Sequence, residues 1–539
     1  MAVMSYLFIL FSVTFGIVNA NSNTDLAFKD AVDPRNFTSD PYLPSFHFVP
    51  FPFNWLNDPN GPCYDPVHQL YHLFYQYQTP RVWGHAVSPN LIDWIQMPIA
   101  LNLGAWYDSG GDYSGSASVL DDDARTIVLT VSSSSDHMFT AIAANRSDPY
   151  LAEWIYADDK DETGTSQPLF TPNTLSRDPT ELLPLTEGGY QLFVGTGNGT
   201  ALWQVDSTDN LYSLDAWYPR GYTLMNTNTP NIFWECPDIF KMPSSDSSDG
   251  VWVSKYSLDG LGDYFFTGDY DSSTGLFTPG IWDISQPQRY DTNDMFYASK
   301  TFYDVVQNRR VLWGWLHMQP WPVDPVVNLT GVTKGTTRKV TKDDDAGWQN
   351  TMGVPRELQQ ANQGGSLTTS PIPELDTLRD QSSLYSDTSS PFLTAPGLLP
   401  IDDISGVRLD ITLQINYTAT SEEEDILCGL RLFLDSSDSD SEFLDVLMPI
   451  DASFNGVFRP MRVLVDGSVV EAFYDGGDTH LGTAETFFYY PKTSSNSGIA
   501  LVMQNNEKNE KESISSSCVF SDIKIWKMNP FKFDISYVQ

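Results

Sequence analysis

Short β-rich segments, rather than helices, dominate this chain. They recur roughly every ten residues between clusters of Gly, Pro, Asn and Asp, whereas long stretches with helical periodicity are almost absent. Clear examples are 69–77, 126–131, 190–194, 251–256 and 310–315. Many short strands at this spacing predict an all-β fold, either a β-propeller or several β-sandwiches. No exact internal repeat sets the number of blades.

The composition changes after Pro355-Arg356-Glu357-Leu358. The following residues are rich in Gln, Ser, Thr and Pro, as in a linker. β-type alternation then resumes, and Asp466-Gly467 between two apolar runs predicts a hairpin with a type I′ turn. A chain of 539 residues is also longer than one hydrophobic core usually supports. We therefore expect a large β domain, the candidate catalytic domain, over 43–358. A linker over 359–399 and a β-sandwich over 400–539 should follow it.

The N-terminus has the pattern of a secretory signal peptide. Residues 7–18 are almost wholly apolar, too few to span a bilayer, and Ala20 follows as a small residue suited to cleavage. We assign residues 1–20 to the signal peptide and 21–42 to an N-terminal extension. The predicted location is extracellular, with a vacuole or similar acidic compartment as the alternative.

The formal net charge of -39 disfavours nucleic acids and anionic membranes as partners, because both would repel the chain. The acidic runs, such as 121–123 and 343–345, lack the spacing and Gly of a calcium loop, so we expect no metal site. The 15 Trp and 26 Tyr offer flat faces that suit sugars. Secreted β-rich proteins are aromatic for structural reasons too, so this signal alone leaves both interpretations open.

Four cysteines do not form a disulfide-stapled scaffold or a zinc framework. Cys428 and Cys518 both lie in the C-terminal part and are the favoured pair, while Cys236, beside Glu235, is expected to be a buried thiol. Five sequons make glycosylation of a secreted chain plausible. They are at Asn36, Asn145, Asn198, Asn328 and Asn416.

Three short acidic stretches are the main candidates for a functional site. Asp58 lies in Asn54–Gly61, Asp178 in Arg177-Asp178-Pro179-Thr180, and Glu235 in Trp234–Asp238. Two opposed carboxylates, with a third to hold the substrate, are the groups needed to break a glycosidic bond. The structural alternatives are that Asp58 and Asp178 belong to ordinary turns and that Glu235 forms a buried ion pair.

These stretches belong to a longer series of motifs that resembles glycoside hydrolase family 32, the invertases, inulinases and related fructosyltransferases. The matches follow the family order from residue 47 to about 475. They are His47-Phe48, Asn54–Gly61, Leu73–Tyr77, Trp83–Ser88, Tyr113–Ala117, Arg177–Pro179, Trp234–Asp238, Phe296–Phe302, Pro355–Leu358, and Val463–Asp466 with Val470-Glu471.

The resemblance implies a five-bladed β-propeller followed by a β-sandwich, and a retaining double displacement at a β-fructofuranosyl unit without any cofactor. It matches Asp58 with the nucleophile, Glu235 with the general acid/base, and Asp178 with the carboxylate that binds fructosyl hydroxyls and stabilises the transition state. It also matches several residues with substrate contacts. These are Asn57, Gln76, Trp83, Tyr113, Ser114 and Arg177.

Each implied role has a physical requirement. Glu235 must be protonated before the first step, so burial beside Trp234 and nearby negative charge should raise its pKa. Arg177 is expected to keep Asp178 ionised and to orient it. Retention requires that the Asp58 and Glu235 carboxyl groups lie roughly 5–5.5 Å apart.

Two positions depart from the family pattern. Tyr113 stands where Trp or Phe is usual, and its phenol can donate a hydrogen bond to an acceptor sugar. Asp259 resembles an Asp that contacts the glucose of sucrose in plant members, but Gly262 replaces the basic residue that usually holds it. Alternatively, Asp259-Gly260 is only a hairpin turn.

The sequence thus predicts a hydrolase that releases terminal non-reducing β-D-fructofuranosyl units from sucrose and short fructans. The alternatives are a fructosyltransferase that makes fructo-oligosaccharides, an exo-acting inulinase or levanase, and, from another class, an inactive carbohydrate-binding protein. The expected partner is a small sugar, not nucleic acid or a membrane. The oligomeric state stays open, with a homodimer as one alternative.

Overall fold

The structure is a computed structural model of the chain. It describes residue 28 and residues 32–538 except 38–39, 79, 159, 161–162, 173, 198, 214–215, 226–232, 244–249, 259–260, 281–286, 293, 318–347, 349, 361–365, 419–425, 435–442, 449–455, 475–482, 490–496 and 506–515. The expected signal peptide, Asn198, Asn328 and Asp259 lie outside these residues.

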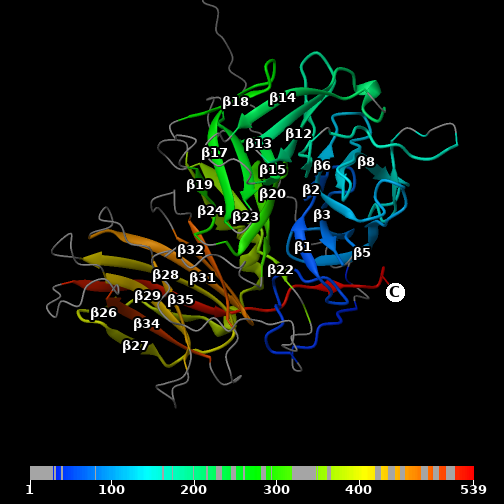
Figure 1. The fold of residues 1–539 in the computed structure, drawn as a ribbon. Coiled ribbons are helices and arrows are strands. Elements are labelled where there is room, and N and C mark those ends of the chain that lie inside the picture. The colour runs from blue at the N-terminus through cyan, green and yellow to red at the C-terminus, as the bar shows by residue number, and fades with distance from the viewer. Residues whose placement is uncertain are drawn as a thin grey trace, which may run out of the picture.

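Five largely antiparallel sheets, arranged in chain order, form the blades of a β-propeller (Figure 1). The five-bladed propeller that the resemblance implied is confirmed. Blade 1 contains β1 (Leu56–Pro59), β2 (Cys63–Asp65), β3 (Leu70–Tyr77), β4 (Val82–Ser88) and β5 (Trp94–Leu101); blade 2 contains β6 (Asp112–Val119), β7 (Ile127–Ser133), β8 (Met138–Ala143) and β9 (Trp154–Tyr156). Blade 3 contains β10 (Ser176–Arg177), β11 (Leu183–Pro184), β12 (Tyr190–Thr196), β13 (Gly199–Val205) and β14 (Tyr218–Met225). Blade 4 contains β15 (Trp234–Lys241), β16 (Trp252–Leu258), β17 (Gly262–Asp271), β18 (Leu276–Pro279) and β19 (Gln288–Arg289); blade 5 contains β20 (Phe296–Asp304), β21 (Arg309–Leu316), β22 (Thr351–Met352), β23 (Arg356–Gln360) and β24 (Leu367–Pro371).

The second strands of blades 1 and 5, β3 and β21, are buried on both faces because each blade packs between two neighbours. In β3, Tyr71 through Tyr77 are all buried, and β21 is buried along its whole length. This explains why these segments read as continuous apolar and aromatic runs instead of alternating strands. At Gly195 the blades approach so closely that a Cβ would lie 1.9 Å from the Trp234 carbonyl oxygen, so the contact between blades 3 and 4 requires glycine.

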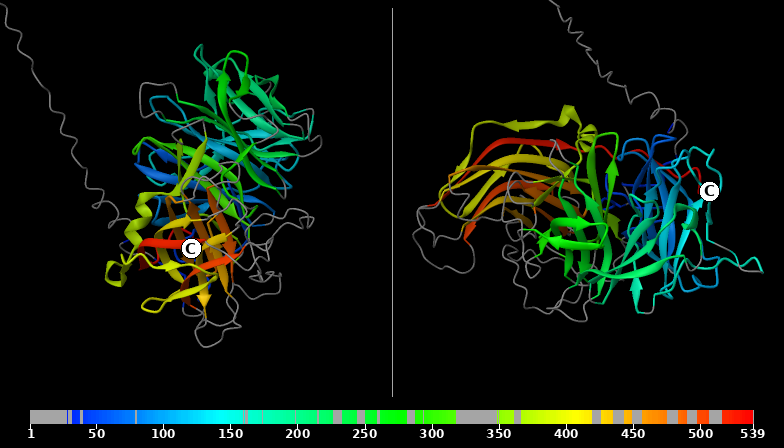
Figure 2. Two further views of the ribbon diagram at one scale, coloured as in Figure 1. Left: turned by 90° about the vertical axis from the view of Figure 1, so that its left-hand side faces the viewer. Right: turned by 90° about the horizontal axis from the view of Figure 1, so that it is seen from above.

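Two further sheets form the C-terminal β-sandwich, which lies beside the propeller (Figure 2). One sheet contains β25 (Tyr385–Asp387), β26 (Phe392–Leu393), β28 (Arg408–Thr418), β31 (Phe458–Asp466), β32 (Val469–Tyr474), β33 (Ala484–Phe488) and β35 (Ser517–Lys527). The other contains β27 (Gly397–Ile401), β29 (Ile426–Leu434), β30 (Leu444–Leu447) and β34 (Gly498–Asn505). The expected hairpin is β31–β32, with Gly467 at φ +65° in its turn. The favoured Cys428–Cys518 disulfide is present and links the two sheets.

Residues 359–399 do not form the expected linker. Their described part contains β24, which completes blade 5, the 3₁₀ helices η2 (Pro373–Leu378) and η3 (Gln381–Ser383), and strands of the sandwich. The polar composition suggested a linker because β24 alternates buried Leu and Thr with half-buried Thr and Ser at a sheet edge. The C-terminus also departs from the expected division, since β36 (Phe533–Asp534) pairs in parallel with β5 of blade 1.

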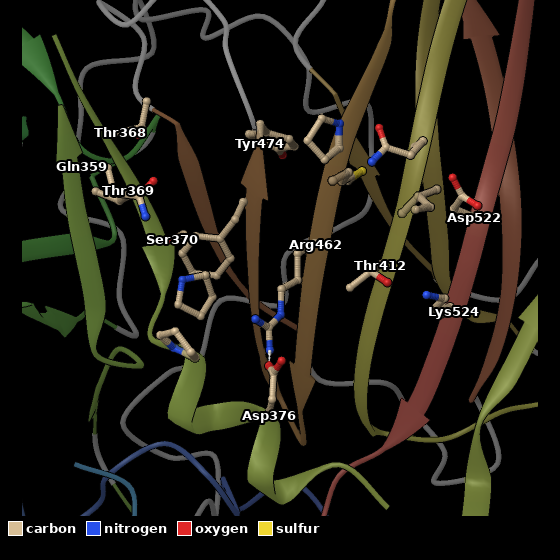
Figure 3. A pocket seen from close by; sticks show the side chains of 17 residues that line it. Gln359, Thr368, Thr369, Ser370, Asp376, Thr412, Arg462, Tyr474, Asp522 and Lys524 are labelled. Carbon is tan, nitrogen blue, oxygen red and sulfur yellow. Dashed lines mark hydrogen bonds and ion pairs between the residues drawn. The ribbon is translucent and has the colours of Figure 1, made fainter. Parts of the chain in front are cut away.

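A cavity of about 700 Å³ lies between the edge of blade 5 and the sandwich (Figure 3). Its wall includes Thr368 and Ser370 of blade 5 and Thr412, Arg462 and Lys524 of the sandwich. None of its lining residues is a candidate site residue. No helix among the described residues has the length and apolar character of a membrane span.

Candidate active site

The first strand of four blades carries a β-bulge at the same place. The irregularities fall between Leu56 and Pro59 in β1, Asp112 and Gly115 in β6, Glu235 and Asp238 in β15, and Tyr297 and Lys300 in β20. In the third blade the short strand β10 ends directly before Asp178, which has φ +64°. Bulges re-aim side chains and interrupt pairing, so each blade can point a polar group away from its own sheet.

These side chains meet in one cavity of about 420 Å³. That volume lies in the range of small-molecule sites. Its lining comprises Trp55, Asn57, Asp58, Gln76, Arg81, Tyr113, Ser114, Arg177, Asp178, Glu235, Tyr297, Trp315 and His317. The structure therefore brings together all three candidate carboxylates and five of the six substrate contacts implied by the resemblance.

Asp58 is held by a chain of hydrogen bonds from blades 1 and 2. Ser114 Oγ donates to Asp58 Oδ2 at 2.5 Å, and Asn57 Nδ2 donates to Asp58 Oδ1 at 3.0 Å. Gln76 orders both donors, because its Nε2 donates to Ser114 Oγ at 2.7 Å and its Oε1 accepts from Asn57 Nδ2 at 2.5 Å. Both carboxylate oxygens of Asp58 thus accept hydrogen bonds from groups that are themselves fixed.

Asp178 lies between blades 2 and 4. Its backbone N–H donates to Ser132 Oγ at 3.0 Å, and its Oδ2 accepts from the Cys236 backbone N–H at 2.9 Å. The Cys236 thiol lies 3.4 Å from Asp58 Oδ2 and 3.7 Å from Asp178 Oδ2. Cys236 is a buried free thiol, as expected, and it bridges two of the three carboxylates.

Glu235 is bound through both of its carboxyl oxygens. Arg177 Nη2 donates to Oε1, and the Tyr297 hydroxyl donates to Oε2 at 2.5 Å. Arg177 Nε lies 3.8 Å from Asp178 Oδ2, so one guanidinium serves two carboxylates. The guanidinium also lies over the Phe233 ring, with 3.9 Å between its central carbon and the ring centroid.

The pKa of Glu235 is raised, as expected. Burial raises its pKa, the negative charge of Asp178 raises it further, and Arg177 and the Tyr297 hydroxyl partly oppose this rise. For Asp178 the expected effect of Arg177 is present, but it is not the largest influence on the pKa. Arg177 does lower the pKa of Asp178, but burial outweighs it and the pKa is raised.

Two buried lysines support the bulge that carries Glu235. Lys255 Nζ donates to the Cys236 carbonyl at 3.2 Å, and Lys300 Nζ donates to the Pro237 carbonyl at 2.7 Å. Lys255 also lies 3.3 Å from Asp263 Oδ2. Because the bulge leaves carbonyl groups outside the ladder, these ammonium groups satisfy them and fix the backbone beside Glu235.

Two of the predicted substrate contacts, Trp83 and Asp259, are not found in the cavity lining. Trp83 does not line the cavity: its side chain is fully buried, and Nε1 donates to the Tyr113 carbonyl at 2.9 Å, behind the cavity wall. It supports Tyr113 instead of reaching a ligand. Asp259 lies outside the described residues, so its proposed contact stays a prediction.

Several lining residues were not singled out from the sequence. Tyr297 lies within the motif Phe296–Phe302, but nothing in the neighbouring sequence indicates its hydrogen bond to Glu235, which is 62 residues away. Arg81 lies over the Tyr113 ring, 5.2 Å from the centroid, and Trp55 and Trp315 pack edge to face at 6.0 Å between centroids. Within the described residues, no three His, Cys, Asp or Glu side chains are grouped as a metal site.

Comparison with known proteins agrees with this geometry. The sequence model described as "Glycosyl hydrolases family 32 N-terminal domain" matches residues 47–371, which end at the last strand of blade 5. The chain is 32% identical over 454 residues to the fructan 6-exohydrolase of Beta vulgaris, covering 80% of this chain and 68% of that relative. It is 28% identical over 564 residues to the acid beta-fructofuranosidase 2, vacuolar, of a Rosa hybrid cultivar, covering 90% and 81%.

The similarity to solved structures extends over the C-terminal sandwich as well. The crystal structure of fructan 1-exohydrolase IIa from Cichorium intybus superimposes with a TM-score of 0.71 at 24% identity, covering 92% of this chain and 99% of that chain. At this identity the likeness shows a common fold. With the family model covering all five blades and the carboxylates gathered at their centre, the chain belongs to glycosyl hydrolase family 32 and is an invertase-like glycosidase.

Proposed function

We propose that the protein is a retaining, exo-acting β-fructofuranosidase that hydrolyses sucrose and short fructans. The observation that carries this proposal is the convergence of Asp58, Asp178 and Glu235, from three different blades, on one cavity. Glu235 has surroundings that favour each of its two forms, because burial and Asp178 favour the protonated acid while Arg177 and Tyr297 favour the carboxylate.

Glu235 acts as acid and then as base. Burial and Asp178 favour its protonated form, so it can protonate the glycosidic oxygen as Asp58 attacks the anomeric carbon of the fructosyl unit. The hydrogen bonds from Arg177 and Tyr297 favour the carboxylate that remains. That carboxylate then removes a proton from the water that hydrolyses the fructosyl–enzyme ester.

Asp178 and the aromatic rim bind the sugar. Asp178 accepts hydrogen bonds from fructosyl hydroxyls, which strengthen as charge develops on the ring. Tyr113, Trp55 and Arg81 line the same cavity and offer stacking faces and hydrogen-bond donors, so we propose that they contact the leaving sugar. The names of the relatives support both sucrose and fructan as substrates, since they include acid β-fructofuranosidases and a fructan 6-exohydrolase.

The stereochemistry of the first product tests the mechanism. Proton NMR during early turnover of sucrose should show β-fructose before mutarotation, and Asp58→Ala should abolish release without unfolding the protein. First-formed α-fructose would refute retention. Initial rates on sucrose, kestose, inulin and levan, with glucose and fructose counted separately, then define the substrate.

Transfer to a sugar acceptor is the second candidate activity, and Tyr113 is the residue that favours it. Oligofructosides dominating over free fructose at high sucrose would identify a transferase. For the location, we propose secretion with glycosylation at Asn36 and Asn145, whose side chains are exposed. Because curated relatives include a vacuolar enzyme, an acidic vacuole is the alternative.

A further inference from the structure

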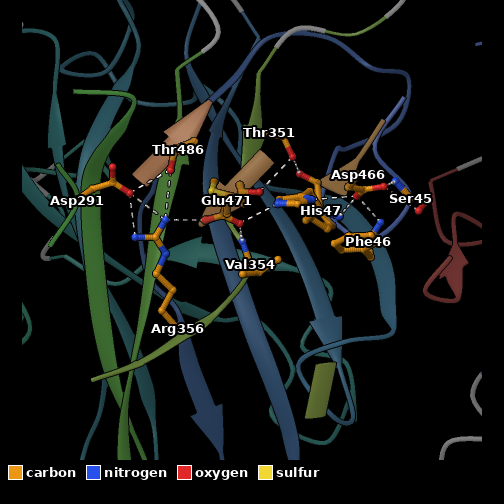
Figure 4. Close-up of polar contacts among 12 residues, drawn as sticks. Ser45, Phe46, His47, Asp291, Thr351, Val354, Arg356, Asp466, Glu471 and Thr486 are labelled. Carbon is orange, nitrogen blue, oxygen red and sulfur yellow. Dashed lines mark hydrogen bonds and ion pairs between the residues drawn. The ribbon is translucent and has the colours of Figure 1, made fainter. Parts of the chain in front are cut away.

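Four residues from sequence motifs that the active site does not use converge at the boundary of propeller and sandwich (Figure 4). His47 precedes β1, Arg356 opens β23, and Asp466 and Glu471 flank the turn of the β31–β32 hairpin. None of the four side chains is more than 1% exposed. Together with Asp291, we call them the interdomain network.

His47 links the two domains through both ring nitrogens. Nδ1 lies 2.9 Å from Asp466 Oδ2, and Nε2 lies 2.8 Å from Glu471 Oε2. A neutral imidazole has only one N–H, whereas two carboxylates each require a donor. The geometry therefore calls for the imidazolium, and the two carboxylates raise the pKa of His47 to about 9 despite its burial.

Arg356 continues the network on the other side of Glu471. Its Nη2 donates to Glu471 Oε1 at 2.6 Å, and Nη1 and Nη2 lie 3.2 and 3.1 Å from Asp291 Oδ2. Arg408 Nε lies 3.9 Å from Asp466 Oδ1. The carboxylates of Asp466, Glu471 and Asp291 thus face the cations His47, Arg356 and Arg408.

The network connects to the active site through residues 350–354, which we call the strap. The Val354 N–H donates to Glu471 Oε2 at 2.9 Å, and the Met352 N–H donates to the Phe48 carbonyl at 3.1 Å. At its other end, Asn350 Nδ2 donates to the Leu56 carbonyl at 3.0 Å, two residues before Asp58.

The strap also contacts the opposite wall of the cavity. Thr351 and Met352 form β22, and Met352 pairs with Trp315, which lines the cavity. The Gly353 N–H donates to the Gly314 carbonyl at 2.9 Å. Glu471 of the sandwich is therefore hydrogen-bonded to one end of the strap, and the backbone of the strap continues from there to hydrogen bonds with the strands that carry Asp58 and Trp315.

We propose that Glu471 is a positioning residue, through which the sandwich sets the placement of the strap and thereby of the Asp58 strand against the cavity wall. This role rests on the hydrolase activity proposed above. The sandwich then contributes to catalysis by positioning the strand of Asp58, although none of its residues lines the cavity. A network that merely joined the domains would contribute to stability and leave turnover of the folded enzyme unchanged.

The variant Glu471→Gln tests this distinction in the full-length enzyme. The amide keeps the shape of the side chain but loses the charge, and its NH₂ group faces either His47 or Arg356, both donors. We expect kcat on sucrose to fall by about tenfold and KM to change less than about twofold, since the sugar contacts stay in place. Assays run well below the Tm of the variant, with circular dichroism to verify folding.

Asp445→Asn is the matched control. Asp445 pairs with Arg431 at 2.7 and 2.8 Å within the sandwich, between β29 and β30. It should lower Tm without lowering kcat. A folded Glu471→Gln enzyme with wild-type kcat, or an equal loss of kcat in Asp445→Asn, would overturn the positioning role.

A second variant covers the case in which Glu471→Gln does not fold. Asn350 has φ +65°, which glycine adopts without strain, so Asn350→Gly removes the amide next to Leu56 and keeps the backbone. It should lower kcat with Tm changed by only a few degrees, and wild-type kcat would contradict the proposal. The two ideas fail separately: fructose release by the wild type tests the function, and the ratio of variant to wild-type kcat tests positioning.

Discussion

The Tyr297 hydroxyl donates a 2.5 Å hydrogen bond to Glu235 Oε2, from the neighbouring blade. Tyr297 lies at the bulge of β20 and Glu235 at the bulge of β15, so the bond forms only when the two irregularities face each other. It stabilises the carboxylate form of Glu235 and lowers a pKa that burial raises. The phenol thereby tunes the group that must carry a proton in one step and lose it in the next.

Replacing Tyr297 by Phe should move the pH profile in a defined direction. Without the hydrogen bond the pKa of Glu235 rises, so the acid stays protonated to higher pH and the alkaline limb of kcat/KM shifts upward by about one unit. The profile on sucrose from pH 3 to pH 9 measures this shift. A limb that stays in place or moves to lower pH would show that Tyr297 does not tune Glu235.

The acid role of Glu235 can be separated from substrate binding by the leaving group. Glu235→Gln should lower kcat/KM on sucrose by about 10³-fold, because the glycosidic oxygen is no longer protonated. For an aryl fructoside with a weakly basic phenolate as leaving group, the loss should be far smaller. Glu187→Gln, at an exposed position, serves as control. Equal losses on both substrates would rule out proton donation by Glu235.

Tyr113 should influence the balance between water and sugar as acceptor. Tyr113→Phe keeps the ring beneath Arg81 but removes the hydroxyl, so the share of trisaccharide product at high sucrose should fall about threefold, while hydrolysis of dilute sucrose changes little. Chromatography of products at several sucrose concentrations gives both rates. An unchanged product ratio would exclude the phenol as an acceptor contact.

Thiol counting tests the cysteine arrangement. Cys63 and Cys236 are buried free thiols whose pKa values burial raises, so a thiol reagent should find almost no reactive group in the native protein. It should find two per chain in denaturant and four after reduction, because Cys428 and Cys518 are joined. Four thiols in denaturant without reductant would contradict the disulfide.

The charge on His47 predicts a loss of stability at alkaline pH. Its pKa is raised from 6.5 to about 9, so its contribution is fully present below pH 6.5 and lost as the pH rises to about 9, a change of about 3 kcal/mol in the free energy of unfolding. Urea unfolding at several pH values measures it.

His47→Asn is the control for this titration. The variant should be less stable at pH 6, but its stability should lack the decline between pH 6.5 and 9 that the wild type shows. Parallel declines in the two proteins would assign the pH dependence to other groups.

The sequence alone determined the all-β class, the two-part organisation and the three candidate carboxylates, and it favoured the Cys428–Cys518 pair. These features depend on local spacing or composition: strand-length apolar runs, turn residues around Asp58, and an Arg-Asp-Pro or Trp-Glu-Cys context. Family resemblance added the number of blades and the implied roles. The polar segment 359–399 was misread as a linker because composition does not reveal that β24 completes a sheet begun near residue 296.

Tertiary structure decided which partners each group has. Arg177 binds Glu235 across 58 residues, Trp83 lies behind Tyr113 instead of facing a ligand, and His47 meets Glu471 across 424 residues. Such contacts depend on how blades twist, where bulges aim their side chains and how the sandwich docks. Burial, which raises the pKa of Glu235 and Asp178, is likewise a property of the assembled fold and has no local signature in the sequence.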